Sequence, residues 1–169
     1  MSPENDCVEQ VTARRHADGH CSVYSEIVID APAAAVWSVL TDFDRMADWS
    51  SSLKNITGDR RQGGKVQSHF FTMGRVWPAD HTFTYDEAAM TFGWSDPLGG
   101  GYEGVRDHHL FRVESLSPTR TRFIQSDEFT GENAARHGVA LAQVGYKSYP
   151  VFNAELRDEV LRRRQAGKA

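Results

Sequence analysis

Two stretches of alternating sequence, His109–Phe111 and Thr121–Gly131, carry polar side chains among large apolar ones. Every second residue of a β-strand points to the same face, so His109, Gln125 and Asp127 share the apolar face of their strands. Polar groups on such a face cost free energy unless water, a ligand or another polar group pairs with them. The pattern therefore predicts a wet cavity, and we expect function to lie there.

Further ionisable side chains join this inner set. His81 alternates with aromatic residues in a predicted strand, and Asp107 lies two residues before His109, with its side chain about 7 Å away on the same face. A histidine beside a carboxylate can transfer protons near neutral pH. We predict His81, His109 and Asp127 as catalytic residues. They could take a proton from an acidic carbon of a substrate, activate water or protonate a leaving hydroxyl.

A structural role for these residues stays open, because a buried histidine and aspartate often only satisfy each other's hydrogen bonds. We expect no metal site and no cofactor. His108 and His109 point to opposite faces of one strand, so they cannot hold the same ion. His69, His81 and His109 could converge from three strands, but their spacing does not require it.

The ligand is expected to touch aromatic and polar side chains on the inner faces. We predict these contacts at Trp77, Phe83, Tyr85, Phe92, Trp94, Asp107, Phe111, Gln125, Tyr149, Phe152, Asn153, His69 and Phe71. The phase of Lys65–Met73 is ambiguous because Phe70 and Phe71 are adjacent. We favour His69, Phe71 and Met73 as inward residues, and a slip of one position would reverse them.

The periodicity also predicts the elements that position these residues. A strand from Val23 to Asp30 precedes a helix that Pro32 opens, and Asp42 starts a second short helix. Period-2 segments follow at Leu53–Gly58, Lys65–Met73, Arg75–Asp86, Met90–Ser95, Glu103–Leu116 and Thr121–Phe129. After Gly131 the period becomes helical, and Pro150 either kinks this helix or begins its final segment.

The motifs in this order resemble the helix-grip superfamily, which includes START-related lipid carriers, polyketide cyclases and the SRPBCC proteins. The resemblance is carried by Ile29-Asp-Ala-Pro32, Val36-Trp37 with Phe43, Gly63-Gly64, His109-x-Phe111, Asp127-x-Phe129-x-Gly131 and Phe152-Asn153-x-x-Leu156. It implies an α+β helix-grip fold, with a seven-stranded curved antiparallel sheet wrapped around a long C-terminal helix and two short helices after the first strand. The family often has glutamate where Asp127 stands, so the carboxylate reaches less far here.

Size and composition favour one domain over residues 21–165, with a flexible arm over residues 1–20. The chain has 169 residues, a net charge of −4 and no basic stripe, so we expect no nucleic-acid partner. No apolar run is long enough for stable membrane insertion, and the polar first residues favour a cytoplasmic protein with Cys7 and Cys21 as free thiols. The sequence leaves monomer and homodimer open.

The resemblance implies a small hydrophobic or aromatic ligand, polyketide-like or lipid-like, in an internal cavity. The chain would then be a cyclase or dehydratase of secondary metabolism. One alternative is a carrier or sensor that binds lipid or aromatic ligands without turnover, and another is a partner-binding domain with no cavity. The glycines at 99–101 follow Pro97 in a turn and are expected to form a flexible gate at the cavity mouth.

Overall fold

The computed structural model describes residues 9–72 and 74–167. Its elements are β1 (Gln10–Arg15), β2 (Cys21–Ile29), α1 (Ala33–Leu40), the 3-10 helix η1 (Phe43–Asp48), β3 (Leu53–Gly58), β4 (Lys65–Thr72), β5 (Arg75–Asp86), β6 (Thr91–Pro97), β7 (Arg106–Ser117), β8 (Arg120–Thr130) and α2 (Ala134–Ala166). This order confirms the predicted succession of a strand, two short helices, six strands and a long helix.

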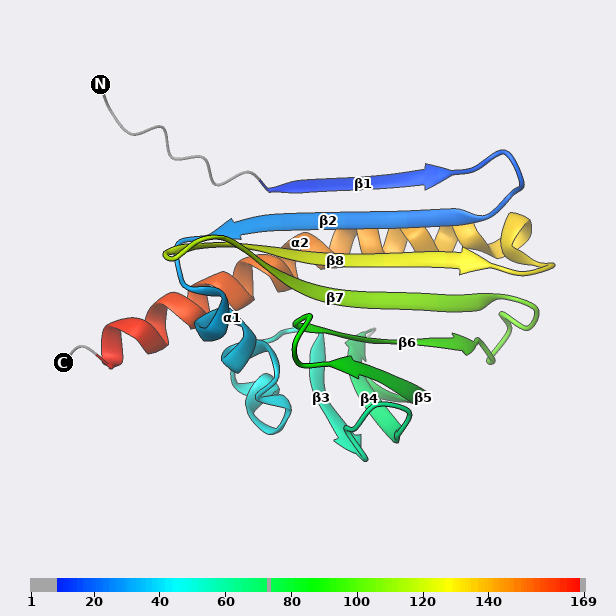
Figure 1. Cartoon of the computed structure of the whole chain (residues 1–169). Coiled ribbons are helices and arrows are strands. Elements are labelled where there is room, and N and C mark those ends of the chain that lie inside the picture. The colour runs from blue at the N-terminus through cyan, green and yellow to red at the C-terminus, as the bar shows by residue number, and fades with distance from the viewer. Residues whose placement is uncertain (1–8, 73, 168–169) are drawn as a thin grey trace, which may run out of the picture.

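The described strands form one antiparallel sheet in the order β1-β2-β8-β7-β6-β5-β4-β3. The long helix α2 lies along β2 and β8 and also contacts β1. The short helix α1 lies beside the C-terminal part of α2 (Figure 1). This is the helix-grip fold that the sequence predicts, with eight strands in place of seven. Within the described residues, no helix has both the length and the apolar character that a membrane crossing requires.

The additional strand β1 lies in the segment expected to be a flexible arm, and that part of the prediction is wrong. Residues 10–15 pair with β2 from Gln10↔Glu26 to Arg15↔Cys21. Five of these six residues are exposed, so the strand has no apolar alternation from which it could be predicted. Cys21 is a buried free thiol, and Cys7 lies outside the described residues.

Aromatic rings from both layers form the main core. Phe92 stacks on Phe111 with 4.6 Å between ring centroids, and Phe152 of α2 lies 5.9 Å from Phe111. A second apolar cluster lies under the first half of α2 and includes Val105, Phe129 and Tyr149. Burying rings of this size dominates the packing energy, because each ring removes a large apolar area from water.

The alternation of β4 is opposite to the predicted phase. Val66 and Ser68 are buried and Phe70 packs against the core, whereas Phe71 is 44% exposed. His69 therefore lies on the other face from Ser68, and the prediction that His69 and Phe71 point inward is wrong. The cause is the pair of adjacent phenylalanines, since either register puts one of them inside. Met73, the third residue of that prediction, lies outside the described residues.

The helix α2 continues through Pro150, which resolves the open alternatives of a kinked helix or a separate final segment in favour of one helical element. Tyr149, Phe152 and Asn153 are buried on its inner side, while Val151 is half exposed. The helix therefore presents both aromatic and polar groups to the sheet on either side of the proline.

Candidate functional site

Two carboxyl groups meet on the inner face of β7 and β8. Asp127 is 3% exposed, and Asp107 is half-buried with its Oδ1 atom fully buried. Trp94 Nε1 donates a 3.1 Å hydrogen bond to Oδ2 of Asp107, and the Tyr149 hydroxyl donates one of 3.0 Å to Oδ2 of Asp127. The Oδ1 atoms of both aspartates have no hydrogen-bond partner among the described residues. A proton shared between the two groups would relieve this, because unpaired buried acceptors are costly.

His109 completes this cluster at the side of Asp127. Its Nε2 atom lies 3.0 Å from the side-chain nitrogen of Gln125, which donates, so Nε2 accepts and Nδ1 carries the hydrogen. Nδ1 lies 3.7 Å from Oδ2 of Asp127. Burial lowers the pKa of His109 to about 4, against the opposing effect of the Asp107 charge. The imidazole is therefore neutral at neutral pH.

The environment of Asp127 favours its protonated form. Burial raises the pKa of Asp127 well above its usual value, and the neighbouring charge of Asp107 raises it further. Burial, followed by the charge of Asp127, also raises the pKa of Tyr149. Asp127 can thus hold a proton at a pH where a free aspartate has lost it, beside a second carboxyl group, the arrangement in which two carboxyl groups divide acid and base roles. We call Asp107, His109, Gln125, Asp127 and Tyr149 the dyad cluster.

His81 belongs to a different cluster. Its Nε2 atom lies 2.9 Å from the hydroxyl of Ser68, and its Nδ1 atom lies 3.2 Å from Oδ2 of Asp96. The indole of Trp94 stacks on the His81 ring at 4.2 Å and lies 4.9 Å from the His109 ring. Trp94 thus separates His81 from His109. Burial lowers the pKa of His81, and the hydrogen bond to Asp96 opposes this effect.

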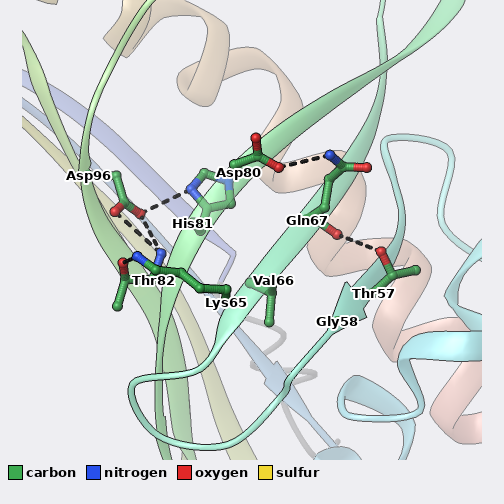
Figure 2. Close-up of a pocket in the computed structure, with 9 residues that line it drawn as sticks. All are labelled: Thr57, Gly58, Lys65, Val66, Gln67, Asp80, His81, Thr82 and Asp96. Atoms are coloured by element: carbon green, nitrogen blue, oxygen red, sulfur yellow. Dashed lines mark hydrogen bonds and ion pairs between the residues drawn. The ribbon is translucent and has the colours of Figure 1, made fainter.

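Two pockets border the His81–Asp96 pair, where β6 diverges from β5. The β5–β6 pairing covers only Phe83↔Trp94 to Asp86↔Thr91, and Asp96 accepts hydrogen bonds from the Thr82 amide beyond that point. One pocket, of about 550 Å³, is lined by Thr57, Gly58, Lys65, Val66, Gln67, Asp80, His81, Thr82 and Asp96 (Figure 2). Figure 2 shows Asp96 bonded to both His81 and Thr82, with Gln67 donating to Asp80 on the other side of the pocket.

The second pocket, of about 610 Å³, opens on the other side of this pair. Its lining is Trp77, Pro78, Ala79, Asp80, His81, Asp96, Pro97, Leu98, Gly99, Gly100 and Tyr102. Trp77 and Tyr102 are about two-fifths exposed, so aromatic rings lie at the pocket margin. Gly99 and Gly100 belong to the turn that the sequence predicts as a gate, and a gating role stays a prediction.

The predicted site residues other than His81, Trp77, His69 and Phe71 separate into three groups, since His81 and Trp77 lie at the two pockets and His69 and Phe71 on the outer face of β4. The dyad cluster and Trp94 bring together five of the predicted inner polar residues with one aromatic. Phe83, Phe92, Phe111 and Phe152 pack against one another in the core, and Tyr85 bonds to Glu87 at the α1 side, beside Trp37. Asn153 donates a 2.7 Å hydrogen bond to Ser25 and has an unpartnered buried Oδ1 atom. Ligand contact by these residues stays a prediction.

Sequence reasoning missed Ser68 and Asp96. Ser68 is the buried small residue of the strand whose phase was assigned wrongly, and Asp96 lies just beyond the predicted end of its strand at Ser95. The signal that could have found Asp96 is the continued alternation Phe92, Trp94, Asp96, which keeps its side chain on the inner face.

The described residues hold one group that could coordinate an ion. Asp107, His109 and Asp127 each offer a ligand atom, and these atoms lie within 4.8 Å of one another. Two carboxylates and an imidazole are donors that divalent transition metals accept. The convergence of three histidines considered from the sequence does not occur, since Trp94 separates His81 from His109 and His69 lies on the other face of β4.

Comparison with known proteins agrees with this fold. Residues 20–149 match the family described as polyketide cyclase/dehydrase and lipid transport. The Zhui aromatase/cyclase from Streptomyces sp. R1128 superposes with a TM-score of 0.72 at 18% identity, over 88% of this chain and 98% of that one. A START superfamily protein from Mycobacterium smegmatis gives 0.66 at 15%, over 85% and 99%. Norcoclaurine synthase from Thalictrum flavum, in complex with dopamine and hydroxybenzaldehyde, gives 0.61 at 16%, over 90% and 96%. No curated protein sequence matches the chain.

Proposed function

The chain belongs to the polyketide cyclase/dehydrase and lipid transport family, and from this premise we propose that it is a cyclase or dehydratase without a cofactor. Its substrate would be a small hydrophobic or aromatic molecule, polyketide-like, enclosed between the sheet and α2. The family supports the binding of such a ligand, and the dyad cluster supplies the groups for its chemistry.

One observation carries the proposal. The buried Asp127 and the half-buried Asp107 each keep a fully buried oxygen without a hydrogen-bond partner among the described residues, next to a neutral imidazole. A purely structural network would be expected to satisfy these oxygens, because each unsatisfied buried acceptor costs about 1–3 kcal/mol. Unpaired buried polar groups beside a carboxyl group whose pKa is raised, as that of Asp127 is, are typical of a site that meets a substrate.

The two carboxyl groups would have different roles in the reaction. The carboxylate of Asp107 would remove a proton from the carbon next to a substrate carbonyl, and the protonated Asp127 would donate its proton to a leaving hydroxyl, which departs as water. His109 would hold Asp127 in position, and Tyr149 would keep Oδ2 of Asp127 occupied so that the proton resides on Oδ1. Acid and base groups placed in this way contribute roughly 10² to 10⁴ in rate.

The proposal is tested with an aryl β-hydroxyketone, 4-hydroxy-4-phenylbutan-2-one, whose dehydration gives a conjugated enone that absorbs in the ultraviolet. We expect the protein to accelerate enone formation. Asp127→Asn should lower this rate at least about 100-fold and leave the affinity for the ligand unchanged. Asp86→Asn, an exposed aspartate on β5, is the matched control and should keep the rate. Acceleration that survives Asp127→Asn and Asp107→Asn would refute acid and base roles for the dyad.

A carrier or sensor without turnover is the second candidate function. It is favoured by the description of the family, which names lipid transport beside the cyclase and dehydrase activities. Native mass spectrometry of the protein purified from bacteria would then show a bound hydrophobic molecule. Two results together would support the carrier function. The wild type would show no turnover, and Asp127→Asn would change the affinity for the ligand.

A further inference from the structure

A serine, a histidine and an aspartate form a hydrogen-bonded chain across β4, β5 and β6. The Ser68 hydroxyl lies 2.9 Å from Nε2 of His81, and Nδ1 of His81 lies 3.2 Å from Oδ2 of Asp96. The Ser68 hydroxyl has a longer contact of 3.4 Å with the Ala79 carbonyl, so His81 is the closer acceptor for its hydrogen. Nucleophile, base and orienting carboxylate are thus in the order that activated serines require.

We propose that Ser68 is an activated nucleophile of a second site, which takes small carboxylic esters or thioesters and is independent of the dyad cluster. His81 is its general base, and Asp96 is the positioning residue that fixes the tautomer of His81. This site shares no residue with the dehydration chemistry proposed above.

The surroundings hold this chain in a fixed orientation. The Asp96 carboxylate accepts hydrogen bonds of 3.3 and 3.2 Å from the Thr82 amide, so its position does not depend on His81 (Figure 2). The His81 ring stacks on Trp94 with an angle of 16° between the planes. A base whose ring and partner are both fixed meets the geometric requirement for proton transfer before the substrate arrives.

The two pockets give the site its substrate class. Ser68 itself is fully buried, while His81 and Asp96 line both pockets, of about 550 and 610 Å³. The larger pocket adds Trp77, Leu98 and Tyr102, which suit an aryl or short alkyl group. Ser68 lines neither pocket, and an acyl group that reaches its hydroxyl from them would have to pass the His81 ring, so we expect a small acyl group and not a long chain.

The chemical step balances with water as the second reactant. The Ser68 oxygen forms a bond to the acyl carbon while its proton moves to Nε2 of His81. The C–O or C–S bond of the substrate then breaks, and the leaving alcohol or thiol takes that proton. Water attacks the acyl-serine, gives its proton to His81 and releases the carboxylic acid, and Ser68 recovers its hydrogen from His81.

The experiment uses a fluorophosphonate probe and 4-nitrophenyl acetate on the full chain. We expect one phosphonyl group per protein, mapped to Ser68 by peptide mass spectrometry, and ester hydrolysis that Ser68→Ala abolishes. His81→Gln should lower the labelling rate at least about 100-fold, and Asp96→Asn should lower it without changing the labelled residue. The labelled position in the wild type decides the question even where a variant fails to fold.

A matched control exists in the same sheet. Ser95 lies 2.8 Å from Nδ1 of His108, but the other nitrogen of His108 contacts the Thr130 hydroxyl, so this pair lacks a carboxylate. Ser95→Ala should leave labelling and hydrolysis unchanged. The inference is overturned if the wild type takes up no probe at Ser68, or if labelling of Ser68 is as fast in His81→Gln. Neither result bears on the dehydration assay, so the two proposals fail separately.

Discussion

Tyr149 of α2 donates a hydrogen bond of 3.0 Å to Oδ2 of Asp127 on β8, and both side chains are buried. This bond joins the helix to the sheet, as the hydrogen bond from Asn153 to Ser25 does one turn further along the helix. The Tyr149 ring also lies 5.2 Å from the His109 ring, between centroids. The helix therefore contributes a polar group to the dyad cluster as well as packing against the sheet.

Replacing Tyr149 by phenylalanine tests this bond. The Tyr149→Phe variant should lose about 1–3 kcal/mol of unfolding free energy, because Oδ2 of Asp127 then joins Oδ1 as an unpaired buried acceptor. Urea unfolding followed by circular dichroism measures the loss. Tyr146→Phe, on the exposed side of the same helix, is the control and should change the unfolding free energy by less than about 0.5 kcal/mol. Equal effects of the two substitutions would contradict the bond.

The raised pKa of Asp127 predicts a pH dependence of stability. In the folded protein Asp127 keeps its proton at a pH where the unfolded chain has lost it, so this group's contribution is full below about pH 4 and is lost as pH rises through the folded pKa. Asp127→Asn removes this loss, since the amide does not ionise. The variant should therefore gain stability relative to the wild type between pH 4 and pH 8 in urea unfolding series. A constant difference across that range would show that Asp127 ionises alike in both states.

His109 predicts the opposite slope. Its pKa falls from 6.5 to about 4 on folding, because burial disfavours the imidazolium, so stability is lost as pH falls from 6.5 toward 4. The loss is at most about 3 kcal/mol, the free energy that corresponds to this pKa difference. His109→Gln should show less loss on acidification in the same unfolding series. His108→Gln, which removes an imidazole from the outer face of the same strand, is the matched control. If the wild type and His109→Gln lose the same unfolding free energy on acidification, the imidazole of His109 is not buried in its neutral form.

Much of the dyad cluster could be predicted from the sequence because strand alternation is unambiguous in β7 and β8. His109 and Phe111 on one strand, and Gln125 and Asp127 on the other, lie on the inner face as the period predicts. The structure brings Asp127 close to both Asp107 and His109, with one ligand atom of each within 4.8 Å of the others. The helix-grip fold itself follows from the order of elements and the closing helix.

The part that escaped prediction has identifiable physical causes. In β4, Phe70 and Phe71 are adjacent, so hydrophobicity supports both registers, and only the packing of Phe70 against the core selects one. The hydrogen-bond partners of His81 could not be predicted, because Ser68 and Asp96 come from two other strands. Side-chain partners across strands are set by register, and register cannot be read from one strand's own pattern.

The close approach of β6 to β7 beside His109 gives the last prediction. Gly93 lies opposite Leu110, and a Cβ atom at position 93 would come within 2.0 Å of the His109 carbonyl oxygen. Gly93→Ala must therefore move the backbone that carries His109, and it should cost about 1–3 kcal/mol of unfolding free energy. It should also weaken ligand binding, because the imidazole moves with its strand.

Gly99→Ala is the control: no atom lies within 4 Å of its added Cβ, and its stability should stay within about 1 kcal/mol of the wild type. Urea unfolding of both variants decides, and a Gly93→Ala protein as stable as Gly99→Ala would mean that β6 and β7 do not approach this closely at His109.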